Sequence, residues 1–248
     1  MSGEKTIAFR EAAVAEAMKV WTVGANEKNK SSTRPIAEDS GFDHTIFKKD
    51  GTTWAWCGMF VAAMLYRAGL CPALRSGMWE TRNVVHFFAY DYEKRVPRWV
   101  WDGDVGGWLE LKTLHQASDS MRTWIDRESM QDTALGALDI LPGDVALIDH
   151  EGDGKPDHIT LVESYDPATG LLMTIEGNGY GRVAKLEDDG TVTLGDKEAD
   201  AVVRNPRDLS DSKQRRRIFG VGRLSAVDFE QRAYANSDRC PSGAPKGG

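Results

Sequence analysis

The spacing of apolar residues changes once along the chain, at Leu141-Pro142-Gly143. Before this point they recur at helical spacing, and after it short runs rich in Val, Ile and Leu are separated by turn residues. Helices followed by hairpin-joined strands are typical of an α+β fold with an antiparallel sheet. We expect helices over 6–21, 57–68 and 80–92, and strands over 144–149, 158–165, 171–176 and 218–224.

The remaining segments give weaker patterns. Residues 24–53 are polar, which favours a long loop with one short turn, and residues 116–130 have helical spacing. Residues 166–170 (DPATG) have the composition of a hairpin turn. Because no repeat or clear linker is visible, we expect one domain over 1–235 and a disordered Gly/Pro/Ser-rich tail over 236–248.

Composition and charge exclude some classes of protein. The chain has 248 residues, of which 41% are hydrophobic and 28% charged, as in ordinary soluble globular proteins. The net charge is −7, and the one basic cluster, 213–217 (KQRRR), fits a solvated approach to a strand. A general nucleic-acid binder needs a basic surface, and a bilayer crossing needs about 20 apolar residues. We therefore expect neither nucleic-acid nor membrane partners.

The first residues, 1–6 (MSGEKT), lack the apolar segment of a secretory signal. We therefore expect synthesis in the cytoplasm without a cleaved signal. A target outside the cell would then require delivery by lysis or by a secretion or injection system.

The position of Cys57 indicates chemistry. It begins the apolar helix expected at 57–68, and Gly69 follows as a helix C-cap. A helix N-terminus favours the thiolate, the nucleophilic form of cysteine. Pairing with Cys71 is disfavoured, because a helix would separate the two by about 15–20 Å, and a disulfide needs about 7 Å. The competing interpretation of Cys57 is a buried, inert cysteine.

Two later segments supply partners for this thiol. An imidazole lowers the pKa of a nearby thiol, and a third polar group orients the ring. His158, at the start of an expected strand, is the predicted base, with His150 as the alternative. Glu176 and Asn178 end the next strand and lie two residues apart, so both should point to one face. We favour Glu176 as the orienting group because a carboxylate stabilises an imidazolium, but Asn178 remains open.

The residues before Cys57 suggest how a substrate is held. The backbone N–H of Cys57 is the first expected oxyanion donor, and a side chain from 52–56 or 24–40 would be the second. Trp54 and Trp56 flank this position, and we expect them to line the substrate cleft.

An acidic segment precedes His158. Asp149, Glu151, Asp153 and Asp157 occupy positions 1, 3, 5 and 9 of an EF-hand-like calcium loop, with Gly154 at position 6. Position 12 is Thr160 rather than a bidentate acid. The competing interpretation is an acidic, Gly-rich β-turn. The thiol chemistry requires no cofactor, so calcium is the one candidate.

The segments WCGMFV (56–61), LPGDV (141–145), DHITLV (157–162) and TIEGN (174–178) resemble the CHAP branch of the NlpC/P60, papain-like superfamily. The resemblance covers about residues 10–180 and implies Cys57 as nucleophile, His158 as base, and Glu176 with Asn178 as orienting groups. Members of this family cut peptidoglycan as N-acetylmuramoyl-L-alanine amidases or endopeptidases, and some relatives cut other amides, including glutathionylspermidine. Relative to a minimal domain of this family, residues about 71–140 are an insertion, and no wall-binding repeat is visible.

The expected function is thus a cysteine amidase or endopeptidase that hydrolyses a peptidoglycan amide, in the stem peptide or at muramoyl-L-alanine. Such a protein would act as an endolysin or an exported antibacterial effector, with an immunity or delivery protein as partner. One alternative is a cysteine hydrolase of a non-wall amide or protein target. Another is a catalytically inactive binding module, which would not need Cys57, His158 and Glu176 together.

Overall fold

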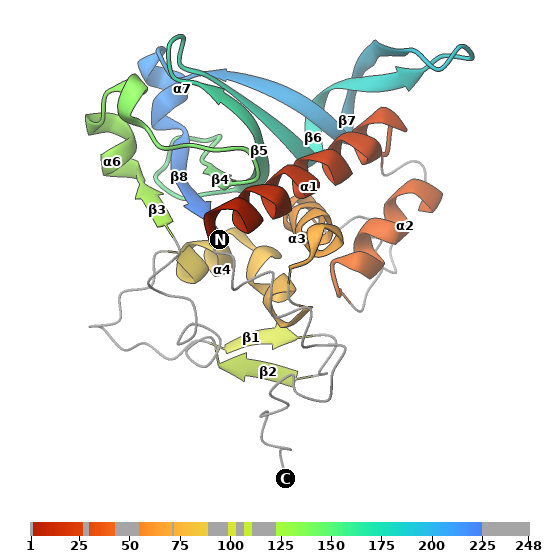
Figure 1. Cartoon of the computed structure of the whole chain (residues 1–248), viewed down its shortest axis with the longest axis horizontal. Helices are drawn as coiled ribbons and strands as arrows, with labels where there is room; N and C mark the ends of the chain where they lie inside the picture. The colour runs from red at the N-terminus through yellow and green to blue at the C-terminus, as the bar shows by residue number, and fades with distance from the viewer. Residues whose placement is uncertain are drawn as a thin grey trace.

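The computed structural model describes residues 2–26, 30–42, 55–70, 72–88, 99–102, 107–110 and 123–224 (Figure 1). Trp54, Cys71, Cys240, the expected tail and parts of the expected insertion lie outside these residues. The described part is an α+β structure with a six-stranded antiparallel sheet of order β3-β8-β4-β5-β6-β7, as the sequence predicts at this level.

The N-terminal half supplies most of the helices. Three predicted helices are confirmed as α1 (Ser2–Thr22), α3 (Cys57–Ala68) and α4 (Thr81–Phe88), and a 3-10 helix, η1 (Pro72–Met78), joins the last two. The expectation of a loop over 24–53 is wrong in part, because α2 (Lys30–Asp39) lies there. Most residues of α2 are polar, but Ile36 and Ala37 are buried and belong to the core that α3 also enters. Tertiary packing therefore overrides the weak local signal.

The strands begin before the predicted change of pattern. A separate two-stranded sheet pairs β1 (Trp99–Asp102) with β2 (Gly107–Glu110). The helix expected over 116–130 is wrong at 123–126, where β3 (Thr123–Asp126) pairs with β8 (Ile218–Arg223). The side chain of Asp126 then caps α6 (Arg127–Asp132) by accepting from the backbone N–H of Ser129. A 3-10 helix, η4 (Leu135–Ala137), follows.

The central strands are the predicted ones, but two of them are much longer. β4 (Val145–Ile148) and β5 (His158–Asp166) match the expected positions, and the turn at 166–170 closes with Gly170 N–H donating to the carbonyl of Asp166. β6 (Leu171–Leu186) and β7 (Val192–Asp208) form a long ribbon whose far end projects from the body in Figure 1. A short helix, α7 (Ser212–Arg216), leads into β8.

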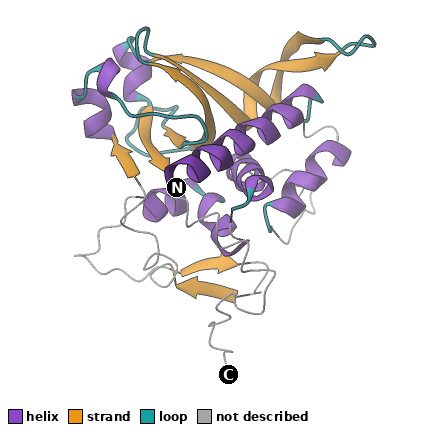
Figure 2. Ribbon diagram, in the orientation of Figure 1, coloured by secondary structure: helices purple, strands orange, loops and turns teal. Residues whose placement is uncertain are grey.

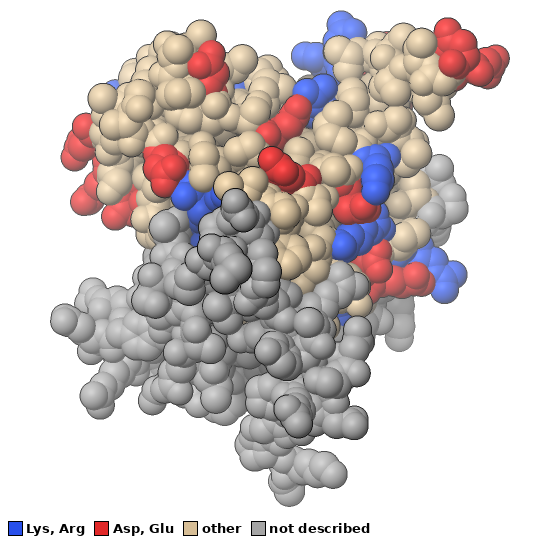
Figure 3. Space-filling view, viewed as in Figure 1, with Lys and Arg blue, Asp and Glu red and all other residues tan. Residues whose placement is uncertain are grey.

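The helices α1 and α3 pack against β5 and β6 of the large sheet, whereas the short helices α6 and α7 lie beside β3, β7 and β8 (Figure 2). Alternate residues of β4 enter different cores: Val145 and Leu147 belong to the core shared with α1 and α3, whereas Ala146 and Ile148 belong to the core that holds Met130 of α6. On the face seen in Figure 3, acidic and basic side chains are interspersed. Within the described ranges, none of the helices combines the length and apolar content that a bilayer crossing requires.

Candidate active site

Cys57 is the first residue of α3, and its side chain is buried, with 5% of the residue exposed. Trp56, the N-cap residue, makes no side-chain capping hydrogen bond, so the first N–H groups of the helix are not taken by a cap. The sulfur instead accepts from the backbone N–H groups of Gly58 and Ile159. The thiol therefore lies between the start of α3 and the start of β5, as the sequence predicts.

Two glycines allow this close packing. A Cβ atom at Gly58 would lie 2.3 Å from the carbonyl oxygen of Met78, and one at Gly177 would lie 2.4 Å from Cβ of Phe60 and 2.7 Å from the Trp56 ring. Such distances are far below van der Waals contact, so only glycine fits at either position. Gly177 therefore lets β6 lie directly against the first turn of α3.

His158, the first residue of β5, joins the thiol to a carboxylate. Its Nε2 lies 3.1 Å from Oε2 of Glu176, and only 8% and 2% of the two side chains are exposed. Nδ1 is the ring nitrogen that remains for the hydrogen bond with Cys57. The structure thus brings together Cys57, His158 and Glu176, with the imidazole between sulfur and carboxylate.

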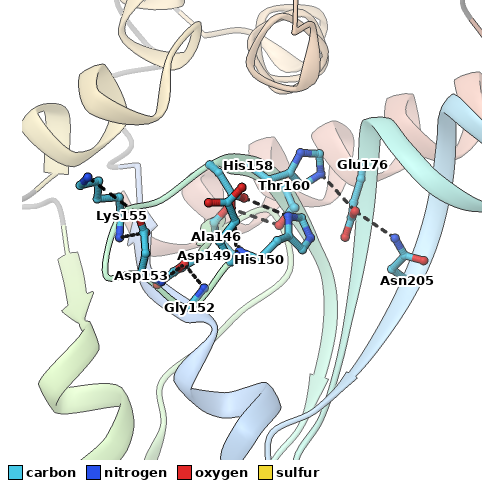
Figure 4. A network of polar contacts seen from close by, with 12 residues as sticks. Ala146, Asp149, His150, Gly152, Asp153, Lys155, His158, Thr160, Glu176 and Asn205 are labelled. Carbon is cyan, nitrogen blue, oxygen red and sulfur yellow. Dashed lines mark hydrogen bonds and ion pairs between the residues drawn. The ribbon is translucent and has the colours of Figure 1, made fainter.

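Four side chains hold the carboxylate of Glu176. Oε1 accepts from Thr174 Oγ1 at 2.5 Å and forms an ion pair with the Arg207 guanidinium at 2.7 Å. Oε2 accepts from Asn205 Nδ2 at 2.9 Å, in addition to its contact with His158. In Figure 4, Glu176 lies between His158 and Asn205. These hydrogen bonds fix the carboxylate, and through it the imidazole ring.

Sequence reasoning missed Asn205 and Arg207 because it placed no strand over 192–208. β7 pairs Asn205 with Thr174 and Val203 with Glu176, so alternate side chains of both strands share one face. Two signals could have found the strand: the Asp-Asp-Gly turn at 188–190 and the apolar run at 201–203.

The three groups shift one another's pKa values. Burial raises the pKa of the Cys57 thiol. The hydrogen bond and charge of His158 and two backbone N–H groups lower this pKa by a larger amount, so the net shift is downward. Burial lowers the pKa of His158, yet Cys57 and Glu176 raise it to about 10. Burial raises the pKa of Glu176, but Arg207 and His158 hold it at about 2. These shifts favour the thiolate form of Cys57, the imidazolium form of His158 and the ionised form of Glu176.

Asn178 lies at a β-bulge. Residues 177 and 178 stand between the pairs Glu176–Val203 and Gly179–Ala201, and Asn178 adopts a left-handed conformation with φ of 56°. The expectation that Glu176 and Asn178 share a face by strand alternation is therefore wrong. Both ring nitrogens of His158 are used by Cys57 and Glu176, so Asn178 does not orient the imidazole. Its buried Oδ1 has no hydrogen-bond partner in the described part of the chain.

The two expected cleft residues have different outcomes. Trp54 lies outside the described residues. Trp56 is fully buried, with 0% exposure, and packs in the core under Gly177. Trp56 therefore does not line an open cleft, because its indole supports the start of α3 from inside.

The acidic loop before His158 uses its carboxylates as hydrogen-bond acceptors. Oδ1 of Asp149 accepts from the backbone N–H of Gly152 at 2.6 Å and of Asp153 at 3.1 Å, and Oδ2 accepts from Gly154 at 2.8 Å. Arg127 lies 3.2 Å from Oδ2. Among the residues whose positions are described, no three acidic, His or Cys side chains gather as metal ligands. Thus Asp149, Glu151, Asp153 and Asp157 do not converge, and the arrangement is that of an acidic turn.

Comparison of the chain with protein-family models, with curated proteins and with solved structures found no match.

Proposed function

We propose that the protein is a cysteine hydrolase that cleaves an amide through an acyl-enzyme. The observation that carries the proposal is the hydrogen-bonded series Cys57, His158 and Glu176, with the thiol at the first turn of α3. A lowered thiol pKa and a base held by a third group are the two requirements of a thiolate nucleophile. A binding module would need neither.

In the proposed reaction, the Cys57 thiolate attacks the amide carbonyl, and the backbone N–H of Cys57 stabilises the oxyanion. His158 gives its proton to the leaving nitrogen as the C–N bond breaks, which leaves a thioester and a neutral imidazole. Water then gives a proton to His158 and attacks the thioester. The C–S bond breaks, the acid leaves, and the thiolate–imidazolium pair is restored. Glu176 stays ionised and stabilises the imidazolium throughout.

The substrate we propose is a peptidoglycan amide, in the stem peptide or at muramoyl-L-alanine. This choice, and the papain-like form of the fold, rest on the resemblance of the four motifs to CHAP and NlpC/P60 domains. Because peptidoglycan lies outside the cytoplasm, the proposal includes delivery by lysis or by a secretion or injection system, and an immunity or delivery protein as partner.

Alkylation with iodoacetamide tests the nucleophile without any substrate. The rate at Cys57 is followed by peptide mass spectrometry between pH 5 and 10, with Cys57→Ala to identify labelling at the other cysteines. We expect appreciable labelling at pH 6 and a much weaker pH dependence than an ordinary thiol shows. A single titration near the usual cysteine pKa of about 8.5 would refute the proposed mechanism. Mass spectrometry of muropeptides from digested sacculi then identifies the bond cut.

A further inference from the structure

A second imidazole lies against the proposed base. The ring centroid of His150, which lies between β4 and β5, is 5.2 Å from that of His158, and the two planes are tilted by 46°. Figure 4 shows the two rings side by side. The His150 side chain is 49% exposed, whereas that of His158 is 8% exposed. His150 is thus the solvent-side neighbour of the group that must protonate the leaving nitrogen.

Asp157 fixes which nitrogen of His150 carries hydrogen. Oδ2 of Asp157 accepts from the backbone N–H of His150 at 2.9 Å and of Glu151 at 3.4 Å. Oδ1 is thereby directed at the ring and lies 2.9 Å from Nδ1 of His150. A carboxylate only accepts, so Nδ1 donates to it, and in the neutral ring Nε2 keeps its lone pair. No partner for this Nε2 is found among the described residues.

The charges that face His150 favour this neutral form. Burial and the positive charges of His158 and Arg207 lower its pKa, while Asp157 raises it, and the net shift is downward. At pH 8 His150 therefore presents an unoccupied acceptor beside His158.

We propose that His150 determines specificity on the leaving-group side, where its Nε2 accepts a hydrogen bond from an N–H of the substrate. The inference rests on the proposed function, because the leaving nitrogen must lie next to His158 to receive its proton. An acceptor there selects leaving groups that carry a further N–H, such as an amino acid extended by a peptide bond. Simple amines, which lack a second N–H, are the disfavoured class.

Three variants isolate the acceptor. His150→Phe keeps a ring and removes both nitrogens, whereas His150→Gln keeps an acceptor. In Asp157→Asn, the amide oxygen must take the place of Oδ2 to accept two backbone N–H groups, so the NH₂ group faces Nδ1. The ring hydrogen then moves to Nε2, and the acceptor becomes a donor without a change of shape. Glu151→Gln, an exposed change in the same loop, is the matched control.

Digestion of peptidoglycan sacculi at pH 8 measures the effect. We expect His150→Phe and Asp157→Asn to lower kcat/KM about tenfold, mainly through KM, as the loss of one hydrogen bond predicts. His150→Gln should recover most of it, and Glu151→Gln should match wild type. The pH dependence of Cys57 alkylation should stay unchanged in all four variants. Wild-type kcat/KM in His150→Phe would overturn the inference.

A second measurement needs no substrate. Long-range ¹H–¹⁵N correlation spectra at pH 8 distinguish the two tautomers, and we expect Nδ1–H at His150 in wild type and Nε2–H in Asp157→Asn. An Nε2–H tautomer in wild type would overturn the acceptor role even if sacculi are digested. Sacculi left intact by wild type would overturn the proposed substrate and the specificity inference with it. Alkylation at pH 6 then decides whether the thiolate mechanism also fails.

Discussion

Two buried carboxylates of this chain lie in similar surroundings but differ in what holds them. The side chains of Glu176 and Asp149 are only 2% and 0% exposed. Glu176 accepts from side chains of three strands, β5, β6 and β7. Asp149 accepts mainly from backbone N–H groups of its own loop, with Arg127 as its one side-chain partner among the described residues.

This difference separates a carboxylate that closes a turn from one that contacts the proposed base. The backbone N–H groups that donate to Asp149 lie within five residues of it, and their hydrogen bonds close a turn. The partners of Glu176 include an imidazole that also contacts a thiol, so its charge acts on a group that can react. Burial alone therefore does not indicate a site, whereas a buried acid that holds an imidazole beside a thiol is a candidate for one.

The largest expected effect is that of Cys57→Ala, which removes the proposed nucleophile and leaves both carboxylates in place. We expect loss of all detectable amide hydrolysis with a nearly unchanged melting temperature, because the change removes little volume. Turnover is measured on sacculi and folding by circular dichroism. Cys71→Ala is the control and should stay active. Substantial turnover by a folded Cys57→Ala protein would show that the thiol is not the nucleophile.

The most direct test of this comparison replaces each of the two carboxylates with the corresponding amide. Glu176→Gln should lower kcat about 10²-fold or more, because the imidazolium loses its ionised partner. Asp149→Asn should keep kcat within a few-fold but lower the free energy of unfolding by about 1–3 kcal/mol, because an amide NH₂ then faces a backbone N–H. Kinetics and urea unfolding measure the two effects.

If Asp149→Asn lowered kcat more than Glu176→Gln did, the roles assigned to the two carboxylates would be reversed. Near-wild-type turnover in Glu176→Gln together with an inactive Asn178→Ala would instead support a triad with Asn178. We expect Asn178→Ala to affect KM more than kcat, because its side chain does not hold the ring.

The sequence predicted the part of the fold that depends on local pattern. Residues 57–68 are mostly apolar and are followed by a glycine, so the helix and its left-handed cap at Gly69, with φ of 119°, follow directly. α2 was missed because its burial depends on packing with α3, which no local spacing encodes. β3 was missed for a similar reason, since its pairing with β8 joins residues as far apart as Thr123 and Arg223.

The sequence predicted that Cys57, His158 and Glu176 lie together, but it did not predict the residues that support them. Cys57, His158 and Glu176 each stand at the start or end of an expected element, where side chains from different elements can meet. The bulge at Asn178 broke the assumed alternation, because one extra residue in a strand reverses every later side chain. The role of Arg207 depends on the pairing register of β7. It could not be predicted, because no strand was expected over 192–208.

The pH dependence of stability gives a smaller effect. The raised His158 pKa contributes stability that is complete below 6.5 and is lost as the pH rises through about 10. The lowered Glu176 pKa contributes stability that is complete above 4.5 and is lost as the pH falls through about 2. The joint contribution is therefore greatest between those values of 4.5 and 6.5. The lowered Cys57 pKa offsets the raised His158 pKa between pH 6.5 and 9, because the folded imidazolium keeps one proton and the folded thiolate lacks one. The free energy of unfolding of wild type relative to Cys57→Ala/His158→Gln should therefore stay level over this range. A steady fall over the same range would show that Cys57 is not held as a thiolate.

The smallest expected effect concerns calcium and the Asp149 loop. Burial raises the pKa of Asp149, but the N–H groups of Gly154, Gly152 and Asp153 outweigh it and keep the net shift downward, so the carboxylate is already satisfied. We therefore expect a chelator and excess calcium to give the same melting temperature, whereas Asp149→Asn should lower it in both. A rise in melting temperature with calcium that is absent in Asp149→Asn would mean that this loop rearranges to bind the ion. Both carboxylates would then support His158. Glu176 would do so through its direct contact with the ring, and Asp149 would do so by binding calcium and ordering the segment that leads into His158.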